Sequence, residues 1–334
     1  DAYGHGLPQI AKLFEDTKEI EHLAVAQVSE ALILINQNTT KRIMLLCGIT
    51  DDQIDTVIEH NIEPLIHDLA SFQALDQKLK EKNIKHYPVH LKINTGLNRL
   101  GFCPDEDLDA LIPLLKDTDS FNIISTYSHF IEGAKKDSEI SHQQNKRFQK
   151  ALKKLNEHNI PTGFHHLCDS GAYEWYENAY YDAVRIGRAL YMDNPNLDEN
   201  ERFKDIGSWH AKVISKRSLK KGDTIGYGGN FICDKDMEIA IINVGYGDGL
   251  LMDFVSLKAP LLINNDQTRL LSIAVDQSTI DITGLDVKLY DIVTLVGFSP
   301  EDTYLSSHEI AKLLDDEGVT LTTLISKRVH RIYE

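Results

Sequence analysis

The sequence lacks the long apolar runs that mark membrane proteins and secreted precursors. None of its apolar stretches is long enough to span a bilayer, and none is typical of a signal peptide. Basic residues are also scarce, with 35 Lys and Arg against 51 Asp and Glu, so the formal net charge is −16. This charge argues against nucleic acid or an anionic membrane surface as a partner.

Cysteine is rare as well. The chain has four cysteines in 334 residues, scattered and without a C-x-x-C pair. Such usage predicts reduced thiols in a cytoplasmic protein instead of a disulfide framework. With 42% hydrophobic and 26% charged residues, the composition is that of a globular protein with room for one large and one smaller domain. The cysteines are Cys47, Cys103, Cys168 and Cys233.

A G-x-G-x-x-G motif after a first strand is also missing, which disfavours the open doubly wound sheet that we keep as the alternative fold. What is present, up to about residue 200, is a regular alternation of short apolar runs with helical patterns. We expect strands at residues 22–26, 42–48, 62–68, 87–94, 121–130, 163–169 and 182–191, with helices between them. Thr50 and Gln53 form a capping box that opens the helix after the second of these strands.

This alternation predicts a parallel sheet with right-handed crossovers, and we favour a (β/α)₈ barrel of the TIM type. The chain opens with DAYGHGLPQI, which is typical of a loop that leaves a strand and enters a helix. We therefore expect the first barrel strand to lie upstream of Asp1, in about 35–45 further N-terminal residues. The intact mass of the purified protein tests this expectation.

The pattern changes after about residue 200. Alternating strands with glycine-rich turns follow, interrupted by one helix near SSHEIAKLLDDEG, and LISKRVHRIYE reads as a last strand. We predict a barrel domain at residues 1–203 and a mostly β domain at residues 204–334. The predicted turns lie at Gly222–Asp223, Gly228–Gly229, Asn264–Asn265 and Gly284.

Polar residues alternate along the predicted strand at 87–94, where a barrel strand is normally apolar on both faces. Its apolar positions can pack under helices, so His90, Lys92 and Asn94 would face the barrel interior. Three polar side chains near the C-terminal end of a strand indicate a binding site, with a buried structural network as the alternative. Arg99, after the turn at Gly96, can reach back over the barrel mouth.

Loops after the last two barrel strands commonly bind phosphate through backbone N–H groups and a hydroxyl. Ser170–Gly171 and Gly187 suit that role, with simple turns as the alternative. Arg185, on the last predicted strand, needs a partner such as a carboxylate, a phosphate or a ring nitrogen. We expect no metal at the cluster His165, His166, Cys168 and Asp169, because adjacent histidines on a strand point to opposite faces.

These motifs, in this order, resemble the alanine racemases, which are fold-type III pyridoxal phosphate enzymes, over essentially the whole chain. The matching motifs are A-Y-G-H-G at residues 2–6, K-x-N-T-G-x-x-R-x-G at 92–101, S-H-F at 128–130, R-x-G-x-x-L-Y at 185–191, G-Y-x-D-G at 245–249 and D-Q-x-x-x-D at 276–281. The resemblance implies interconversion of L- and D-alanine, which supplies D-alanine for bacterial peptidoglycan, by a two-base mechanism that depends on pyridoxal 5′-phosphate.

The resemblance also implies two bases on opposite faces of the cofactor. One is the lysine that forms the Schiff base, which would lie two residues upstream of Asp1. The other is Tyr246, which in this family acts in the site of the second subunit. The resemblance therefore implies a homodimer with shared active sites that acts on a small amino acid.

Further roles follow from the resemblance alone. Arg185 would face the pyridine nitrogen, Arg99 the phenolic oxygen, and Lys92 matches a lysine that is carbamylated in some members. The implied cofactor-binding residues are Tyr3, Arg99, His129, Ser170, Arg185, Gly187 and Arg188. Substrate contacts would come from Arg99, Val275 and Asp276, and Lys92, His166 and Asp169 would support them.

The match departs from the family pattern at a few positions. Asp169 stands where the family usually has Asn, and its charge could be compensated by Arg188. Val275 replaces the usual Met, and Val319 or a neighbour stands where the family has a phosphate-binding tyrosine. These departures leave two alternatives open, which are a racemase for another small amino acid such as serine and a non-catalytic cofactor-binding relative.

Overall fold

The computed structural model describes residues 1–191, 205–315 and 318–334, which fall into two compact units. The barrel unit comprises Leu7–Gly187, and the β unit comprises Asp1–Gly6 together with Arg188–Glu334. The first six residues therefore belong with the C-terminal part of the chain. The domain boundary predicted between residues 203 and 204 lies outside the described residues.

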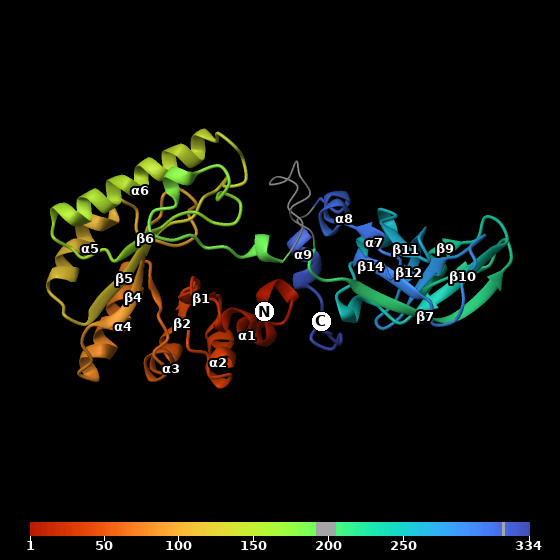
Figure 1. The fold of residues 1–334 in the computed structure, drawn as a ribbon, viewed down its shortest axis with the longest axis horizontal. Coiled ribbons are helices and arrows are strands. Elements are labelled where there is room, and N and C mark those ends of the chain that lie inside the picture. Colours follow the sequence, from red (N-terminus) through yellow and green to blue (C-terminus); the bar gives the residue numbers. More distant parts are fainter. Residues whose placement is uncertain (192–204, 316–317) are drawn as a thin grey trace. The chain divides into compact units, whose positions relative to one another are not determined.

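The barrel unit contains the predicted alternation of parallel strands and helices (Figure 1). Strands β1 and β2 form one parallel pair and β3–β6 form a four-stranded parallel sheet, while a parallel bridge between Met44 and Glu63 links the two. The strands are β1 (His22–Val25), β2 (Arg42–Leu45), β3 (Leu65–Ile66), β4 (Tyr87–Lys92), β5 (Phe121–Tyr127) and β6 (Phe164–His166). The helices are α1 (Leu7–Glu15), α2 (Val28–Asn36), α3 (Ile54–Glu59), α4 (Leu69–Glu81), α5 (Asp107–Lys116) and α6 (Glu139–Glu157).

Local sequence explains where these helices begin and which faces they bury. The Asp68 side chain caps α4 by accepting from the Ser71 N–H at 2.7 Å, and Thr50 N–H donates to Gln53 Oε1 at 3.1 Å, in the predicted capping box. The apolar faces of α3–α6 then pack against the outward side chains of β4, which are fully buried. Val89, Leu91 and Ile93 thus face the helices, as the alternating pattern predicted, which leaves His90 and Lys92 to the interior.

The prediction of a regular strand at residues 182–191 is wrong. The segment runs parallel to the end of β6 through a single bridge between Asp169 and Arg185, and it then turns into a short 3-10 helix, η4 (Arg188–Leu190). Backbone bonds from Asp182 N–H to His165 O and from Arg185 N–H to Cys168 O, each 3.0 Å, hold it there. Pairing is interrupted because the Gly187 N–H donates to the Ser170 hydroxyl instead of to a strand carbonyl.

The β unit is built around a sheet that closes on itself. Its strand order is β11-β12-β13-β10-β7-β14-β15, and β11 pairs with β14 as well as with β12, which removes the exposed strand edges at that seam. The strands are β7 (Trp209–Leu219), β8 (Thr224–Ile225), β9 (Phe231–Ile232), β10 (Met237–Ile242), β11 (Pro260–Ile263), β12 (Asp266–Ile273), β13 (Ser278–Asp281), β14 (Ile292–Phe298) and β15 (Tyr304–Leu305). The helices are α7 (Asp253–Ser256), α8 (Ser307–Leu313) and α9 (Gly318–Thr323).

Turn chemistry in the β unit is as predicted. Asn264 and Asn265 both have positive φ angles, 48° and 66°, and form the two-residue turn between β11 and β12. The prediction of a last strand at LISKRVHRIYE is wrong, because the segment after α9 turns back on itself. There the Arg331 guanidinium donates to the carbonyls of Ile325, Ser326 and Val329, which curls the backbone around one side chain.

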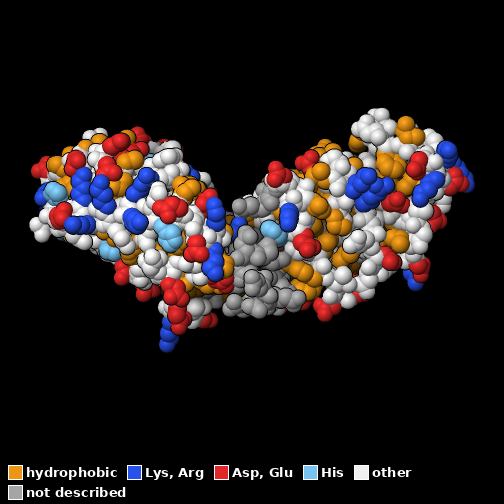
Figure 2. Space-filling view, turned by 90° about the horizontal axis from the view of Figure 1, so that it is seen from above, with side chains coloured by type: hydrophobic (Ala, Val, Ile, Leu, Met, Phe, Trp, Pro, Cys, Tyr) orange, Lys and Arg blue, Asp and Glu red, His pale blue; other side chains and the backbone are white. Residues whose placement is uncertain are grey.

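The surface and the cysteines agree with the composition. Figure 2 shows basic side chains interspersed with acidic ones on the visible face, without a continuous field of one sign. All four cysteines lie in the described part of the chain and are free thiols. Across residues 1–191, 205–315 and 318–334, the structure contains no helix with the length and apolarity that a membrane crossing requires.

Candidate active site

The barrel interior carries the polar residues that the alternation in β4 predicted. His90 and Lys92 are 0% and 7% exposed, and both are surrounded by other polar side chains of the barrel strands. Asn94 has a different role, because its side-chain oxygen accepts from the backbone N–H groups of Gly96 and Asn98 at 3.0 and 3.1 Å. It therefore shapes the turn that leads to Arg99.

Arg185 is the centre of this interior. Its Nη1 donates to His166 Nδ1 at 2.6 Å and to His166 O at 3.1 Å. Its Nη2 donates to Ser128 O at 2.7 Å, to His129 Nδ1 at 3.2 Å and to Leu167 O at 3.3 Å. Each of these acceptors is a neutral imidazole nitrogen or a backbone carbonyl, so the guanidinium keeps its charge and Nε is left for a ligand.

The cations of the site depress the basicity of their neighbours. Burial, followed by the charges of Arg185 and Arg99, holds the pKa of Lys92 well below its usual range. Burial and the charges of Arg185, Lys92 and Arg99 lower the pKa of His129 to about 3. The Lys92 Nζ also lies 4.0 Å from the centre of the Tyr127 ring. The site is therefore a concentration of positive charge that favours an anionic ligand.

Asp169 is the acidic member of this group. Its Oδ1 accepts from the N–H groups of Gly171 and Ala172 at 2.9 and 3.1 Å, and its Oδ2 lies 3.3 Å from His129 Nε2. Because the lowered pKa keeps His129 neutral, this last contact joins a neutral imidazole to a carboxylate and is not an ion pair. Asp169 thus organises the loop after β6, while its predicted compensation by Arg188 stays a prediction.

Two predicted phosphate-binding groups lie side by side in the barrel unit. The Ser170 hydroxyl accepts from the Gly187 N–H at 2.8 Å. This bond ties the loop after β6 to the segment that carries Arg185, so one serine connects two loops of the predicted phosphate site.

The other two predicted phosphate-binding residues, Tyr3 and Arg188, belong to the β unit. Tyr3 lies in the short 3-10 helix η1 (Ala2–Gly4), which packs on α9, and a Cβ on Gly4 would lie 1.9 Å from Thr322 O. The Tyr3 ring lies 5.8 Å from that of Tyr191. Val319, where the family has a tyrosine, lies in α9, the helix on which η1 packs.

Three other predicted residues gather on an exposed face of the β unit. Tyr246 and Val275 are 49% and 43% exposed. The Tyr246 N–H donates to Ala274 O at 3.1 Å and the Gly247 N–H donates to Val275 O at 2.9 Å, which brings the two loops together. Glycine is required beside Tyr246, because a Cβ on Gly245 would lie 2.2 Å from Ala274 O.

Arg328 completes this face, and sequence reasoning missed it. Its Nε lies 2.7 Å from Asp248 Oδ1 and its Nη2 lies 2.8 Å from Asp276 Oδ1. Nη2 also donates to Val275 O at 3.3 Å. Asp276 therefore lies on the same face as Tyr246 and Val275, and its carboxylate already has a partner. We refer to Tyr246, Val275, Asp276 and Arg328 as the tyrosine face.

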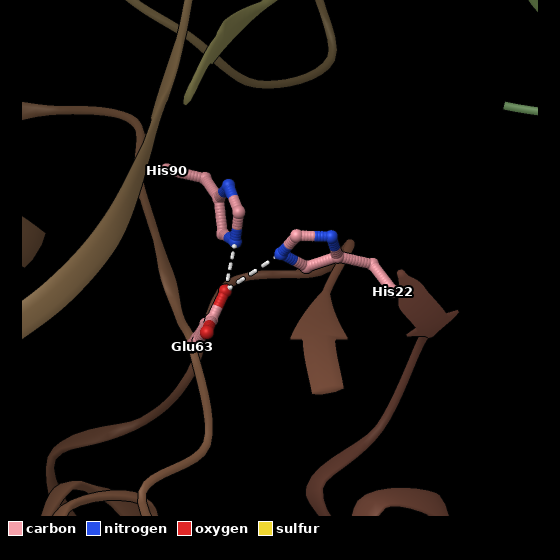
Figure 3. Close-up of side chains that lie close together, drawn as sticks. All are labelled: His22, Glu63 and His90. Atoms are coloured by element: carbon pink, nitrogen blue, oxygen red, sulfur yellow. Dashed lines mark hydrogen bonds and ion pairs between the residues drawn. The ribbon is translucent and has the colours of Figure 1, made fainter. Parts of the chain in front are cut away.

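Sequence reasoning also missed a cluster at the far end of the barrel interior. His22, Glu63 and His90 place one ligand atom each within 4.8 Å of one another, and Figure 3 shows both imidazoles pointing at one oxygen of Glu63. By these distances the cluster could hold a metal ion, in a different place from the histidines considered in the sequence. Glu63 lies within the apolar run at residues 62–68, so its pattern indicated a strand and nothing more.

The residues of the barrel interior fit pyridoxal phosphate, which carries a phosphate, a phenolic oxygen and a basic ring nitrogen. Arg185 and Arg99 supply positive charge, and Arg185 leaves one guanidinium N–H for a ring nitrogen. The Ser170 hydroxyl, whose oxygen accepts from the Gly187 N–H, keeps its own proton to donate at the loop where barrels bind phosphate. The donor set therefore matches the three polar groups of this cofactor.

Comparison with known proteins identifies the family. The family model "Alanine racemase, N-terminal domain" matches residues 1–195, and "Alanine racemase, C-terminal domain" matches residues 206–333. A curated relative, alanine racemase 1 of Clostridium acetobutylicum, is 29% identical over 338 residues, which cover 100% of this chain and 86% of that protein.

Solved structures give the same result. Alanine racemase from Bartonella henselae with covalently bound pyridoxal phosphate is 25% identical with a TM-score of 0.86, and the match covers 100% of this chain and 90% of that one. A histidine racemase from Leuconostoc mesenteroides is 26% identical with a TM-score of 0.84, covering 99% and 88%.

The chain has the fold of a pyridoxal-phosphate-dependent isomerase, with a TIM-type barrel and a mostly β second domain. The chain belongs to the alanine racemase family.

Proposed function

We propose that this protein interconverts L- and D-alanine by a two-base mechanism as a cytoplasmic homodimer and so supplies D-alanine for peptidoglycan. The observation that carries the proposal is the environment of Arg185. All its hydrogen bonds go to neutral imidazole nitrogens and backbone carbonyls, so no carboxylate is hydrogen-bonded to it. A full cation facing the ring nitrogen keeps that nitrogen unprotonated, which favours racemisation over the chemistry of aminotransferases.

When bound, pyridoxal phosphate supplies an electron-withdrawing group that makes the α-proton of an attached amino acid acidic enough to remove. The chain's own residues would bind and orient the cofactor and move the substrate proton. Ser170, Gly187, Tyr3 and Arg188 would hold the phosphate, and Arg99 would lie at the phenolic oxygen. The lowered pKa of Lys92 leaves it with the neutral amine that carbamylation requires.

Tyr246 is the proposed base on one face of the substrate, and the Schiff-base lysine that the resemblance implies is the base on the other. The tyrosine face supports this role, because it holds a phenol, a carboxylate and an apolar side chain together and outward on tight turns. The resemblance implies that this tyrosine acts in the site of a second subunit, which requires a homodimer. Val275 and Asp276 would then contact the substrate beside it.

A racemase for another small amino acid is the second candidate. Val275 is smaller than the methionine usual in the family and stands on the tyrosine face, where it would widen the pocket. The solved structure named histidine racemase has the same fold with a TM-score of 0.84. Assays with D-alanine and D-serine in parallel separate the two candidates.

The shared site is tested by complementation of two inactive variants, expressed from the complete reading frame. Arg185→Lys keeps a charge but loses the planar fork, and Tyr246→Phe loses the proton carrier, so each should lower kcat at least about 100-fold. Random mixing of the two variants should restore about a quarter of the wild-type activity, since half of the dimers then contain one intact site. No recovery on mixing would contradict shared sites, and inactive wild-type protein would contradict the racemase itself.

A further inference from the structure

A chain of hydrogen bonds crosses the barrel interior from Arg185 to Glu63. Arg185 Nη1 donates to His166 Nδ1 at 2.6 Å, and His166 Nε2 lies 2.8 Å from Ser125 Oγ. Ser125 Oγ lies 2.7 Å from His90 Nδ1, and His90 Nε2 lies 2.9 Å from Glu63 Oε2. Ser125, His90, His166 and Glu63 are all buried, with exposed fractions of 0%, 0%, 3% and 4%.

Donors and acceptors along this chain can be assigned from its two ends. Arg185 has only donors, so His166 Nδ1 must accept and the single ring proton of His166 is on Nε2. That proton goes to Ser125 Oγ, so the serine hydroxyl donates to His90 Nδ1. The ring proton of His90 is then on Nε2, where it donates to the Glu63 carboxylate. Every group is satisfied in this one direction, from guanidinium to carboxylate.

Both histidines are neutral, as this assignment requires. Burial above all keeps the pKa of His90 below its usual value, against the opposing effect of Glu63. Burial, followed by the charge of Arg185, holds the pKa of His166 well below its usual value. Each ring therefore carries one proton, and its position decides which nitrogen accepts.

The carboxylate at the far end is fixed in the ionised form. Burial alone would raise the pKa of Glu63, but contacts with His22, His90 and Arg42 lower it to about 2. Arg42 Nε donates to Glu63 Oε1 at 2.5 Å, and His22 Nε2 lies 3.3 Å from Oε2 (Figure 3). Because an ionised carboxylate can only accept, it draws the His90 proton to Nε2.

A reversed chain would break the contact with Arg185. If His90 Nε2 gave its lone pair to a metal or to a donor, the His90 proton would move to Nδ1 and donate to Ser125 Oγ. The Ser125 hydroxyl would then lose its acceptor on His90, and it could satisfy its proton within this chain of hydrogen bonds only by donating to His166 Nε2. In that reversed state the His166 proton lies on Nδ1 and faces the Arg185 N–H, two donors at a distance of 2.6 Å.

We propose that Glu63, His90 and Ser125 are positioning residues that fix the tautomer of His166 and thereby hold Arg185 in its orientation toward the cofactor ring. The inference rests on the proposed role of Arg185 at the ring nitrogen. The cluster of His22, Glu63 and His90 is then the anchor of this chain and not a metal site.

The decisive variant is Glu63→Gln, whose amide has nearly the same shape but can also donate to His90 Nε2. Nitrogen-15 NMR of histidine-labelled protein, with the His166 signals assigned through His166→Gln, reports the tautomer directly. Wild-type His166 should be in the Nε2–H form, and Glu63→Gln should populate the Nδ1–H form. In the enzyme loaded with pyridoxal phosphate, the visible absorption band should shift and kcat should fall about tenfold, the effect of about one hydrogen bond, with KM little changed.

Controls separate this role from a general effect on folding. Asp182→Asn changes a carboxylate that contacts His165 in β6 but takes no part in the hydrogen bonds between Arg185 and Glu63. It should change neither the His166 tautomer nor the absorption band. Ser125→Ala interrupts the chain without a change of charge, so it repeats the test if Glu63→Gln does not fold. Glu63→Gln and Ser125→Ala should each populate the Nδ1–H form of His166, whereas Asp182→Asn should not.

The outcomes are distinct. A His166 tautomer and an absorption band that stay unchanged in Glu63→Gln and Ser125→Ala would overturn the proposal, as would stoichiometric zinc in the purified protein that is lost in His90→Gln. If wild-type protein binds no pyridoxal phosphate, the proposed function fails, while the tautomer measured in the same protein still decides whether the chain orders His166.

Discussion

The barrel interior and the tyrosine face position their functional side chains in opposite ways. In the barrel, buried groups hold one another through short hydrogen bonds, and Arg185 is fixed by two histidines. On the tyrosine face, the side chains are exposed and the backbone does the positioning, through tight glycine turns around Tyr246. The barrel interior is therefore ordered by polar chemistry and the tyrosine face by backbone geometry.

This difference sets how each region should respond to change. A buried polar group that loses its partner costs the full desolvation of that group, whereas an exposed ion pair contributes little because water replaces it. We therefore expect low pH and isosteric substitutions to disrupt the hydrogen bonds of the barrel interior. Loss of a charge on the tyrosine face should change the free energy of unfolding little.

Acid should have the largest effect. The folded protein keeps His166 neutral, whereas the unfolded chain binds a proton there below about pH 6.5, so stability is present above that pH and is lost as the pH falls. The free energy of unfolding should decrease from pH 7 to pH 5, and His166→Gln should make this slope shallower by up to about 1.4 kcal/mol per pH unit. Urea denaturation at several pH values measures both slopes.

The matched control for this experiment is His60→Gln, at the exposed C-terminal end of α3. It should leave the pH slope unchanged. An equal slope in wild type and His166→Gln would mean that the buried imidazole is not what makes the barrel sensitive to acid.

Asp169→Asn should have an intermediate effect, on the cofactor instead of on the fold. Asn has one oxygen where Asp169 uses two, one for the backbone of the loop after β6 and one toward His129. We expect binding of pyridoxal phosphate to weaken about tenfold, the effect of about one hydrogen bond, although the substitution restores the residue usual in the family. An absorbance titration with the cofactor checks this, and tighter binding would refute it.

Arg328→Gln should have the smallest effect on stability. Arg328 is 45% exposed in its side chain, and its pairs with Asp248 and Asp276 lie at the surface. The free energy of unfolding should change by less than about 1 kcal/mol, while the loosened tyrosine face lowers kcat a few-fold. A loss of more than about 2 kcal/mol in urea denaturation would show that this face is ordered by ion pairs after all.

Much of the fold could be predicted from the sequence. Periodicity located the barrel strands and helices, and turn residues such as Asn264–Asn265 located the hairpins, because these signals depend only on neighbours in the chain. The predictions failed where a single side chain decides the backbone path. Ser170 takes the Gly187 N–H from a strand, and Arg331 curls the C-terminal segment that its alternating pattern presents as extended.

The site could be predicted in its residues but not in its connections. Alternation in β4 located His90 and Lys92, and the motifs located Arg185 and Tyr246. No pattern marked Glu63, Ser125 or Arg328, because each is a lone polar residue whose partners come from distant segments. Serine and glutamate at such positions are ordinary in any strand or loop.

By itself, the sequence determined which segments form strands and helices and which residue types reach the barrel interior, since both follow from periodicity along the chain. Only the tertiary structure decided that Glu63 and His90 connect to Arg185 through Ser125 and His166. A hydrogen bond requires two groups within about 3 Å, and that proximity depends on how strands far apart in the chain are placed side by side.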